Sequence, residues 1–318
     1  MISIVITTHN EGDELIRTVD SIRENTNDYE IIVVDDGGTD DSVGRVRQHP
    51  EVKIVRNDER IGIAYSRNRG VDESQGDCVG FLDGHQRVSP GCMNDCADLA
   101  RQTGGMVWPS VRGLKDRGWT SFGAHMRIQD HHRKVGFFGG RYNRTQPRDK
   151  VVRIGTMMVP GYVVTKDVFN GKIRLVDGLR GWGASEPALS VKAFFTDTPI
   201  FGLKAEFRAD GTWRRGPMAR HYFREGGHMP FRQSFKGVSR NHLAIARVCF
   251  ADDTFNNYWR KIRIFTKKLG KEGIESVYKD FTDQHEEFQK IKARPDVEFW
   301  RGLMLEDDVP RGVKRNEG

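Results

Sequence analysis

The 318-residue chain has only four cysteines, Cys78, Cys92, Cys96 and Cys249. They are too few and too irregularly spaced for a disulfide framework, and the C-x3-C pair at 92 and 96 lacks the second pair that a zinc site needs. No apolar run approaches the roughly 18–20 residues of a membrane span, and residues 2–8 are too short for a signal peptide. We therefore expect reduced thiols, a cytoplasmic location and no membrane association.

The glycine-rich patterns that cradle nucleotide phosphates are also missing. Where a dinucleotide fold carries G-x-G-x-x-G after its first strand, this chain reads Thr-His-Asn-Glu-Gly at residues 8–12, and no P-loop occurs. A nucleotide bound here would be held by side chains and a metal ion.

Charge is unevenly distributed along the chain. The net charge is +7, but residues 1–100 hold 10 Lys+Arg against 20 Asp+Glu, whereas residues 101–318 hold 41 against 24. The basic excess lies in residues 101–160, with 12 against 3, and in residues 201–250, with 10 against 3. We expect the acidic and the basic part to serve different partners.

The first 84 residues alternate between buried strands and amphipathic helices. Apolar runs predict strands at 2–8, 29–36, 52–56 and 77–83, and helices are expected from Asn10 as a cap, at about 40–48 and at 62–73. This order predicts an α/β fold with a doubly wound, mostly parallel sheet and a ligand crevice at the carboxyl ends of its strands.

Further along, the alternation loosens. Strands are expected at 106–111 and 151–165, a helix at 185–195, and a helical extension after Phe235. An aromatic stripe at helical spacing, from Phe255 to Leu269, indicates core packing. We divide the chain into 1–105, 106–235 and 236–318.

The candidate chemistry centres on residues 81–85, Phe-Leu-Asp-Gly-His. Asp83 and His85, two residues apart at the end of the fourth strand, present a carboxylate and an imidazole to one divalent cation. Mixed ligands of this kind favour Mn²⁺ over an all-oxygen Mg²⁺ site. Such a cation would act as a Lewis acid on a departing diphosphate.

Residues 81–85 resemble the F-L-D-x-H motif of the polypeptide N-acetylgalactosaminyltransferases, which are GT-A glycosyltransferases of the family 2 type. Three other segments are similar to this family's R-x-G-L-x-x-A-R, W-G-G-E-N-L-E-I-S and H-V-F-R-x-x-H motifs, and they are residues 60–67, 181–190 and 221–228. The resemblance covers about residues 2–231. It implies a GT-A fold, in which the first part binds a nucleotide sugar and the second part binds the acceptor.

The resemblance also implies roles for single residues. The Mn²⁺ ligands would be Asp83, His85 and His221. The uridine would be held by Thr7, His9 and either Asp35 or Asp36, with Arg67 near the donor. The catalytic candidates are Trp182 beside the leaving group, Glu186, and Arg224, which with His228 would belong to a loop that closes over the diphosphate.

Several of these roles have alternatives. Trp182 would also fit simple packing, and Asp35 would also fit a turn cap. Glu186 stands one residue later than the acid of the family motif, so it would orient the sugar, face the acceptor or cap a helix. As a base it would make the enzyme inverting, whereas the D-x-H resemblance implies retention, with the departing diphosphate taking the acceptor proton. Since the chain shows neither a transmembrane anchor nor a lectin-like domain, we expect it to differ from the animal Golgi members.

The acceptor is predicted from the basic segments. Transfer of GalNAc, GlcNAc or glucose from a UDP-sugar to a 5-hydroxymethylpyrimidine in DNA, as in some bacteriophages, is the favoured hypothesis, and it requires base flipping. Phosphates would be contacted by Arg112, Lys115, Arg117, Arg127, Arg133, Lys134, Arg141, Arg144 and Arg148. Bases would stack on Trp108, Trp119, Phe122, Phe137, Phe138 and Tyr142. A saccharide or glycolipid acceptor, a protein Ser/Thr acceptor, and a non-catalytic nucleotide-sugar or nucleic-acid binding module are the alternatives.

Overall fold

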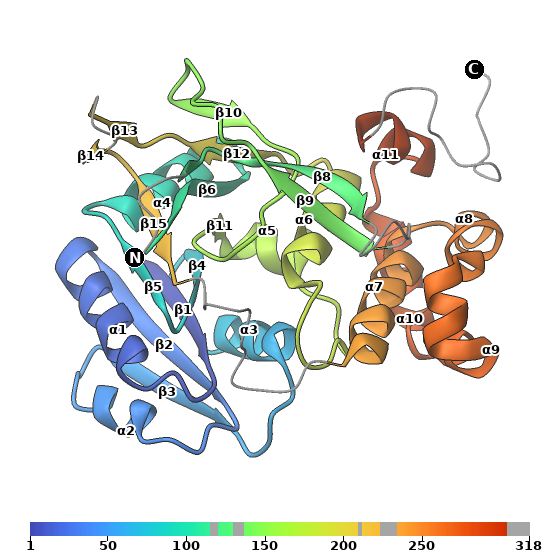
Figure 1. The fold of residues 1–318 in the computed structure, drawn as a ribbon, viewed down its shortest axis with the longest axis horizontal. Coiled ribbons are helices and arrows are strands. Elements are labelled where there is room, and N and C mark those ends of the chain that lie inside the picture. Colours follow the sequence, from blue (N-terminus) through green and yellow to red (C-terminus); the bar gives the residue numbers. More distant parts are fainter. Residues whose placement is uncertain (115–119, 130–136, 209–211, 223–233, 304–318) are drawn as a thin grey trace.

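The computed structural model describes residues 1–114, 120–129, 137–208, 212–222 and 234–303. A mixed sheet with helices on both of its faces forms the body of the protein, and a group of helices lies at the end of the described chain (Figure 1). No helix in these ranges combines the length and the apolar character needed to cross a membrane.

Four parallel strands form the first part of the sheet, in the order β4-β1-β2-β3. They are β1 (Ile2–Thr8), β2 (Tyr29–Asp36), β3 (Val52–Asn57) and β4 (Cys78–Asp83). β1 is buried along its whole length because both faces of the sheet are covered. The connecting helices are α1 (Asp13–Asn25), α2 (Ser42–Val46) and α3 (Ile63–Asp72), and the predicted doubly wound alternation is confirmed.

The start of α1 differs from the prediction. Asn10 does not cap the helix, because Gly12 takes the cap position with a φ of 55° and no side chain bonds there. The Asn10 side-chain oxygen instead accepts hydrogen bonds from the backbone N–H groups of Thr39 at 2.7 Å and Asp40 at 3.1 Å. Asn10 therefore ties together the two turns that follow β1 and β2.

The second part of the sheet continues beyond β4 in the order β10-β12-β6-β11-β4. Its strands are β6 (Met106–Gly113), β10 (Val151–Arg153), β11 (Val163–Thr165) and β12 (Ile200–Leu203). The single strand expected over 151–165 is wrong, because β10 and β11 are separate strands that pair with different neighbours. Pro160, which has no N–H to donate, and Gly161, with a φ of 118°, interrupt the extended segment just before β11.

β15 (Met218–His221) connects this second part to the end of β4. It runs parallel to β6 and antiparallel to β5 (Gln86–Val88), the short strand after β4, and aligns His221 with Gln86. α4 (Cys92–Thr103) follows β5, and β7 (Thr120–Ser121) pairs with β6. Two hairpins lie outside the main sheet, and they are β8 (Ala124–Gln129) with β9 (Phe137–Tyr142), and β13 (Glu206–Phe207) with β14 (Trp213–Arg215).

Helices make up the remainder of the described chain. α5 (Lys166–Val168), the π-helical turn η1 (Phe169–Ile173) and α6 (Ser185–Phe195) precede β12. The C-terminal group consists of α7 (Phe235–Cys249), α8 (Asp252–Asn257), the 3-10 turn η3 (Trp259–Lys261), α9 (Arg263–Asp280), α10 (Thr282–Ile291) and α11 (Asp296–Leu303). The helical extension is confirmed, whereas the division of the chain into three segments stays a prediction.

Aromatic side chains fill the space between the sheet and the C-terminal helices. Trp259 lies between Phe250, at a ring-centroid distance of 5.1 Å, and Trp300, at 5.7 Å. Phe138 of β9 reaches the same cluster, 4.8 Å from Trp259. The predicted packing role of the aromatic stripe is confirmed, although the stripe is divided among α8, η3 and α9.

Candidate metal centre

Asp83 and His85 lie at the turn between β4 and β5. The N–H of Asp83 donates to the side-chain oxygen of Gln86 at 2.8 Å, and the N–H of Gly84 donates to the Thr7 carbonyl at 3.2 Å. These bonds fix the turn at the carboxyl edge of the sheet. His221, 138 residues beyond Asp83, reaches the same place because β15 pairs with β5.

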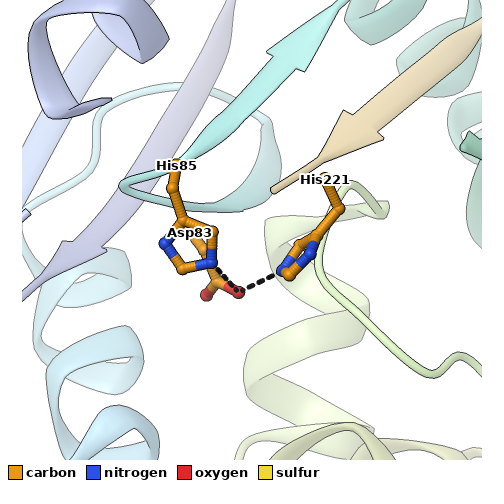
Figure 2. A group of neighbouring side chains, drawn as sticks. All are labelled: Asp83, His85 and His221. Atoms are coloured by element: carbon orange, nitrogen blue, oxygen red, sulfur yellow. Dashed lines mark hydrogen bonds and ion pairs between the residues drawn. The ribbon is translucent and has the colours of Figure 1, made fainter. Parts of the chain in front are cut away.

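The three predicted metal ligands meet at this edge. Their ligand atoms all lie within 4.8 Å of one another. Nε2 of His221 is 3.3 Å and Nε2 of His85 is 4.0 Å from the same Asp83 oxygen, Oδ2 (Figure 2). Glu11 fixes the opposite side of the His85 ring, since its Oε1 is 3.1 Å from Nδ1. A carboxylate behind a ligating imidazole orients the ring and increases its basicity.

The protonation of this group suits metal binding. Burial alone would raise the pKa of Asp83, but the hydrogen bond with His221 and the charges of His85 and Arg67 outweigh it and hold the pKa at about 2. Burial lowers the pKa of His221 below its usual value despite the nearby Asp83. A carboxylate and a neutral imidazole are the forms that coordinate metals. One carboxylate and two imidazoles fit Mn²⁺, which accepts both oxygen and nitrogen ligands.

Arg67 is fully buried and lies against Asp83, one of the predicted metal ligands. One of its terminal nitrogens donates to Glu186 at 2.6 Å and to the Tyr162 hydroxyl at 3.3 Å, and the other lies 3.4 Å from Asp83. Although burial opposes its charge, Glu186, Tyr162 and Asp83 raise the pKa of Arg67 above its usual value. The guanidinium therefore links Asp83 to Glu186, the acid that stands one residue later than in the family motif.

Glu186 has two hydrogen-bond partners in this network. Besides Arg67 it accepts a hydrogen bond from the Ser185 hydroxyl at 2.7 Å, and its side chain is only 13% exposed. No side chain caps α6, whose cap position is held by Ala184 with a φ of 76°. The helix-cap alternative for Glu186 is therefore wrong.

The residues predicted to hold uridine lie on the ends of β1 and β2. Thr7 is buried, and its hydroxyl has no hydrogen-bond partner among the described residues. Nδ1 of His9 lies 2.8 Å from the Asp36 carbonyl oxygen. Asp35 accepts a hydrogen bond from the Gly38 N–H at 2.7 Å and forms an ion pair with Arg56 at 2.9 Å. The bond to Gly38 agrees with the alternative role of Asp35 as a turn cap.

Asp36 holds part of the protein's own backbone with one carboxylate oxygen, and its predicted contact with uridine stays a prediction. One of its carboxylate oxygens accepts hydrogen bonds from the Asn57 side-chain amide at 2.9 Å and from the N–H groups of Ile61 at 2.9 Å and Gly62 at 3.2 Å. This oxygen holds the loop between β3 and α3 against the end of β2.

That loop is in turn bound to the segment around Trp182. Gly181 donates to the Ile61 carbonyl at 2.8 Å, and a Cβ on Gly62, whose φ is 132°, would lie 2.3 Å from the Gly181 nitrogen. Glycine is therefore required where these two motif segments cross. Trp182 is 42% exposed, which disagrees with the packing alternative.

Two predicted site residues, Arg224 and His228, lie outside the described residues, and their roles stay predictions. Sequence reasoning missed Glu11 and Tyr162, the second of which is fully buried against Arg67. In the sequence, Glu11 is one of several acidic residues near the start of the first helix, and no pattern around Tyr162 distinguishes it from a core aromatic residue.

The predicted base-stacking surface is wrong for the four rings that the structure describes. Trp108, Phe122 and Phe138 are buried, and Tyr142 is largely covered, because these rings pack inside the protein. Trp119 and the side chain of Phe137 lie outside the described residues. Of the predicted phosphate contacts, Arg127, Arg141, Arg144 and Arg148 are exposed, Arg112 lies over the Phe207 ring at 5.6 Å, and Lys115, Arg117, Arg133 and Lys134 lie outside the described residues.

Known proteins are similar to this chain in sequence. The chain is 27% identical to polypeptide N-acetylgalactosaminyltransferase 5 of Caenorhabditis elegans over 291 residues, which cover 82% of this chain and 43% of that protein. It is 44% identical to human polypeptide N-acetylgalactosaminyltransferase 14 over 92 residues, which cover 27% of this chain and 17% of that protein. The chain thus spans less than half the length of these curated relatives.

Solved structures share the fold. GalNAc-T7 with UDP, GalNAc and Mn²⁺ gives a TM-score of 0.66 at 18% identity, over 89% of this chain and 55% of that chain. S. aureus TarS 1-349 in complex with UDP-GlcNAc gives a TM-score of 0.51 at 15% identity, over 92% of this chain and 81% of that chain. The predicted GT-A fold is therefore confirmed. The family model for glycosyl transferase family 2 matches residues 3–163, just over half of the chain. The chain belongs to glycosyl transferase family 2.

Proposed function

We propose that this protein is a Mn²⁺-dependent glycosyltransferase that uses a UDP-sugar as donor. The observation that carries the proposal is the convergence of Asp83, His85 and His221 at the carboxyl edge of a GT-A sheet. The names of the relatives support the donor, since GalNAc-T7 was solved with UDP, GalNAc and Mn²⁺, and TarS with UDP-GlcNAc. The sugar would be GalNAc, GlcNAc or glucose.

In this proposal Asp83, His85 and His221 hold Mn²⁺, which supplies Lewis-acid stabilisation of the departing diphosphate. Thr7 and His9 contact the uridine. Asp36 supports the site by holding the loop between β3 and α3 in place. Trp182, exposed beside the glycine crossing, faces the donor. Arg224 and His228 close over the diphosphate.

The transfer would be retaining. An inverting enzyme needs a base within reach of the acceptor hydroxyl. Glu186 is a poor candidate because its two oxygens are engaged by Arg67 and Ser185. The acceptor proton then passes to an oxygen of the departing diphosphate.

Measurement of UDP release from UDP-GalNAc, UDP-GlcNAc and UDP-glucose tests the donor. Turnover should require Mn²⁺, and Asp83→Asn should weaken Mn²⁺ binding by at least about tenfold, because even changes behind a ligand cost that much. Asp98→Asn, which removes an exposed carboxylate on α4, is the matched control. Turnover without metal, or equal Mn²⁺ affinity in the two variants, would contradict the proposal. The anomeric coupling of the first product in proton NMR distinguishes retention from inversion.

For the acceptor we propose a 5-hydroxymethylpyrimidine in DNA, supported by the basic excess in residues 101–160 and by the exposed arginines of that segment. With the aromatic residues buried, this proposal depends on charge alone. The names of the relatives favour a second candidate, the hydroxyl of a peptide Ser or Thr. Sugar transfer should therefore be compared on hydroxymethylated DNA, on Ser/Thr peptides and on glycans. Labelling of peptide with unlabelled DNA would reject the DNA acceptor and leave the donor assignment intact.

A further inference from the structure

A basic depression of about 490 Å³ lies away from the metal centre, beside the β13–β14 hairpin. Its lining residues come from the segment before β10, from the end of β12, and from the hairpin with the residue that follows it. They are Arg148, Lys150, Lys204, Glu206, Arg215 and Gly216. Four cations and one carboxylate leave three positive charges uncompensated.

The local ion pairs do not neutralise this surplus. Both oxygens of Glu206 are taken by Arg215, at 2.7 and 3.0 Å. Among the described residues, no carboxylate lies within ion-pair distance of Arg148 or Lys150. The nearest effect is on Asp95 of α4, where burial raises the pKa of the carboxyl group and the charge of Lys150 partly opposes that rise. Cations gathered in one depression attract anions, so the arrangement suits an anionic ligand.

The depression is built on fixed backbone. The Lys204 ammonium donates to the carbonyls of Pro147 at 3.0 Å and Arg148 at 2.8 Å, which leaves one of its three N–H groups for a ligand. The Lys204 N–H bonds the Lys150 carbonyl at 2.8 Å. Gly216, with a φ of 87°, passes so close that a Cβ would lie 3.2 Å from the Lys204 carbonyl oxygen. The backbone of the depression and the Lys204 ammonium are thus held in place by the protein itself.

β15 connects this depression to the metal centre. Gly216 stands two residues before the strand, and His221 ends it, so the two are five residues apart in the sequence. At about 3.3 Å per residue the separation is about 16 Å. Duplex DNA rises about 3.4 Å per base pair, so this distance corresponds to about five base pairs.

We propose that this basic depression binds backbone phosphates of a phosphodiester polymer whose reacting hydroxyl lies at the metal centre. The inference rests on the proposed function and deepens it by naming an acceptor subsite. Three surplus charges match consecutive phosphodiesters, each with one negative charge, and exceed what a single carboxylate would balance. Arg148 has a planar guanidinium that can donate two parallel hydrogen bonds, and Lys150 has a compact ammonium charge. Both groups bind phosphate oxygens well.

Fluorescence anisotropy of a labelled 20-mer DNA with the full chain tests the subsite at several salt concentrations. Arg148→Ala/Lys150→Ala should weaken binding about 5- to 30-fold at 0.1 M salt. It should also reduce the slope of log affinity against log salt by about two, one unit for each phosphate that is no longer neutralised. The matched control is Lys267→Ala/Lys271→Ala, which removes the same charge from exposed positions of α9 and should leave the slope unchanged.

Equal effects of the two double variants would overturn the subsite and indicate general electrostatic attraction. Failure of the unaltered chain to bind DNA, or binding of a sulfated glycan in place of DNA, would overturn it as well. UDP release by the unaltered chain with Mn²⁺ is measured separately. Release without DNA binding therefore rejects the subsite alone, and absence of release rejects the proposed function.

Discussion

Replacement of Arg67 with methionine should destabilise the protein strongly, although no surface changes. The guanidinium is fully buried and lies between Asp83 and Glu186, whose side chains are 16% and 13% exposed. Methionine fills a similar volume but leaves both carboxylates without their cation. Removal of one partner from a buried ion pair costs about 3–5 kcal/mol.

The chain length converts this cost into a thermal shift. With an unfolding entropy of about 2.1 cal/mol/K per residue, 318 residues give about 0.7 kcal/mol/K, so Arg67→Met should lower Tm by about 4–8 °C. Differential scanning calorimetry measures this shift. Mn²⁺ should recover more Tm in the variant than in the unaltered chain, because the ion supplies positive charge to Asp83.

Arg45→Met is the matched control, because Arg45 and Asp13 form an ion pair whose side chains are 46% and 62% exposed. Exposed pairs contribute about 0–1 kcal/mol, so its Tm should fall by no more than about 2 °C. A double variant, Arg67→Met/Glu186→Gln, should regain part of the lost stability, since one orphaned charge is removed. Equal Tm values for the Arg67 and Arg45 variants would refute the assignment of Arg67 as the compensating charge of the site.

Three other substitutions test the framework around the site. Gly62→Ala places a Cβ 2.3 Å from the Gly181 nitrogen at a φ of 132°. It should lower the free energy of unfolding in urea by about 2–3 kcal/mol, and an unchanged free energy would disprove the close crossing. Asp36→Ala removes the acceptor of the Ile61 and Gly62 N–H groups and should cost about 2–4 kcal/mol, whereas Asp36→Asn keeps an oxygen there and should cost about half as much. Trp182→Ala, at a site 42% exposed, should change unfolding by less than about 1 kcal/mol but raise KM for the UDP-sugar, and an unchanged KM would remove Trp182 from the donor site.

Local sequence patterns predicted the part of the fold and the site that local interactions determine. Apolar runs and helical stripes located β1 to β4, and the turn after β4 located Asp83 and His85. His221 was found only through a family resemblance, because its position depends on the pairing of β15 with β5, more than 130 residues away along the chain. No local sequence pattern predicts how β15 aligns with β5.

The errors have a related cause. Trp108 and Phe138 were expected on the surface because basic residues surround them in the sequence, yet their rings face the core while arginines such as Arg127 and Arg141 point outward. In the β8–β9 hairpin, the alternation of side chains along each strand separates Phe138 from these arginines, since neighbours in a strand face opposite sides. Trp108 is buried in a different strand, β6. A mixed basic and aromatic segment therefore does not by itself indicate a stacking surface.

The acidic first part of the chain acquires a physical meaning from the site. A UDP diphosphate is an anion, and residues 1–100 carry a balance of −10, so this part alone would repel its own proposed donor. At the site, Asp83 and Glu186 share one arginine, and Glu11 adds a third carboxylate beside His85, so carboxylates outnumber the single guanidinium. A divalent cation would offset this excess of negative charge at the place where the diphosphate would lie. We therefore expect the proposed metal to aid binding of the donor as well as departure of the diphosphate, while the basic charge of the second part remains available for the acceptor.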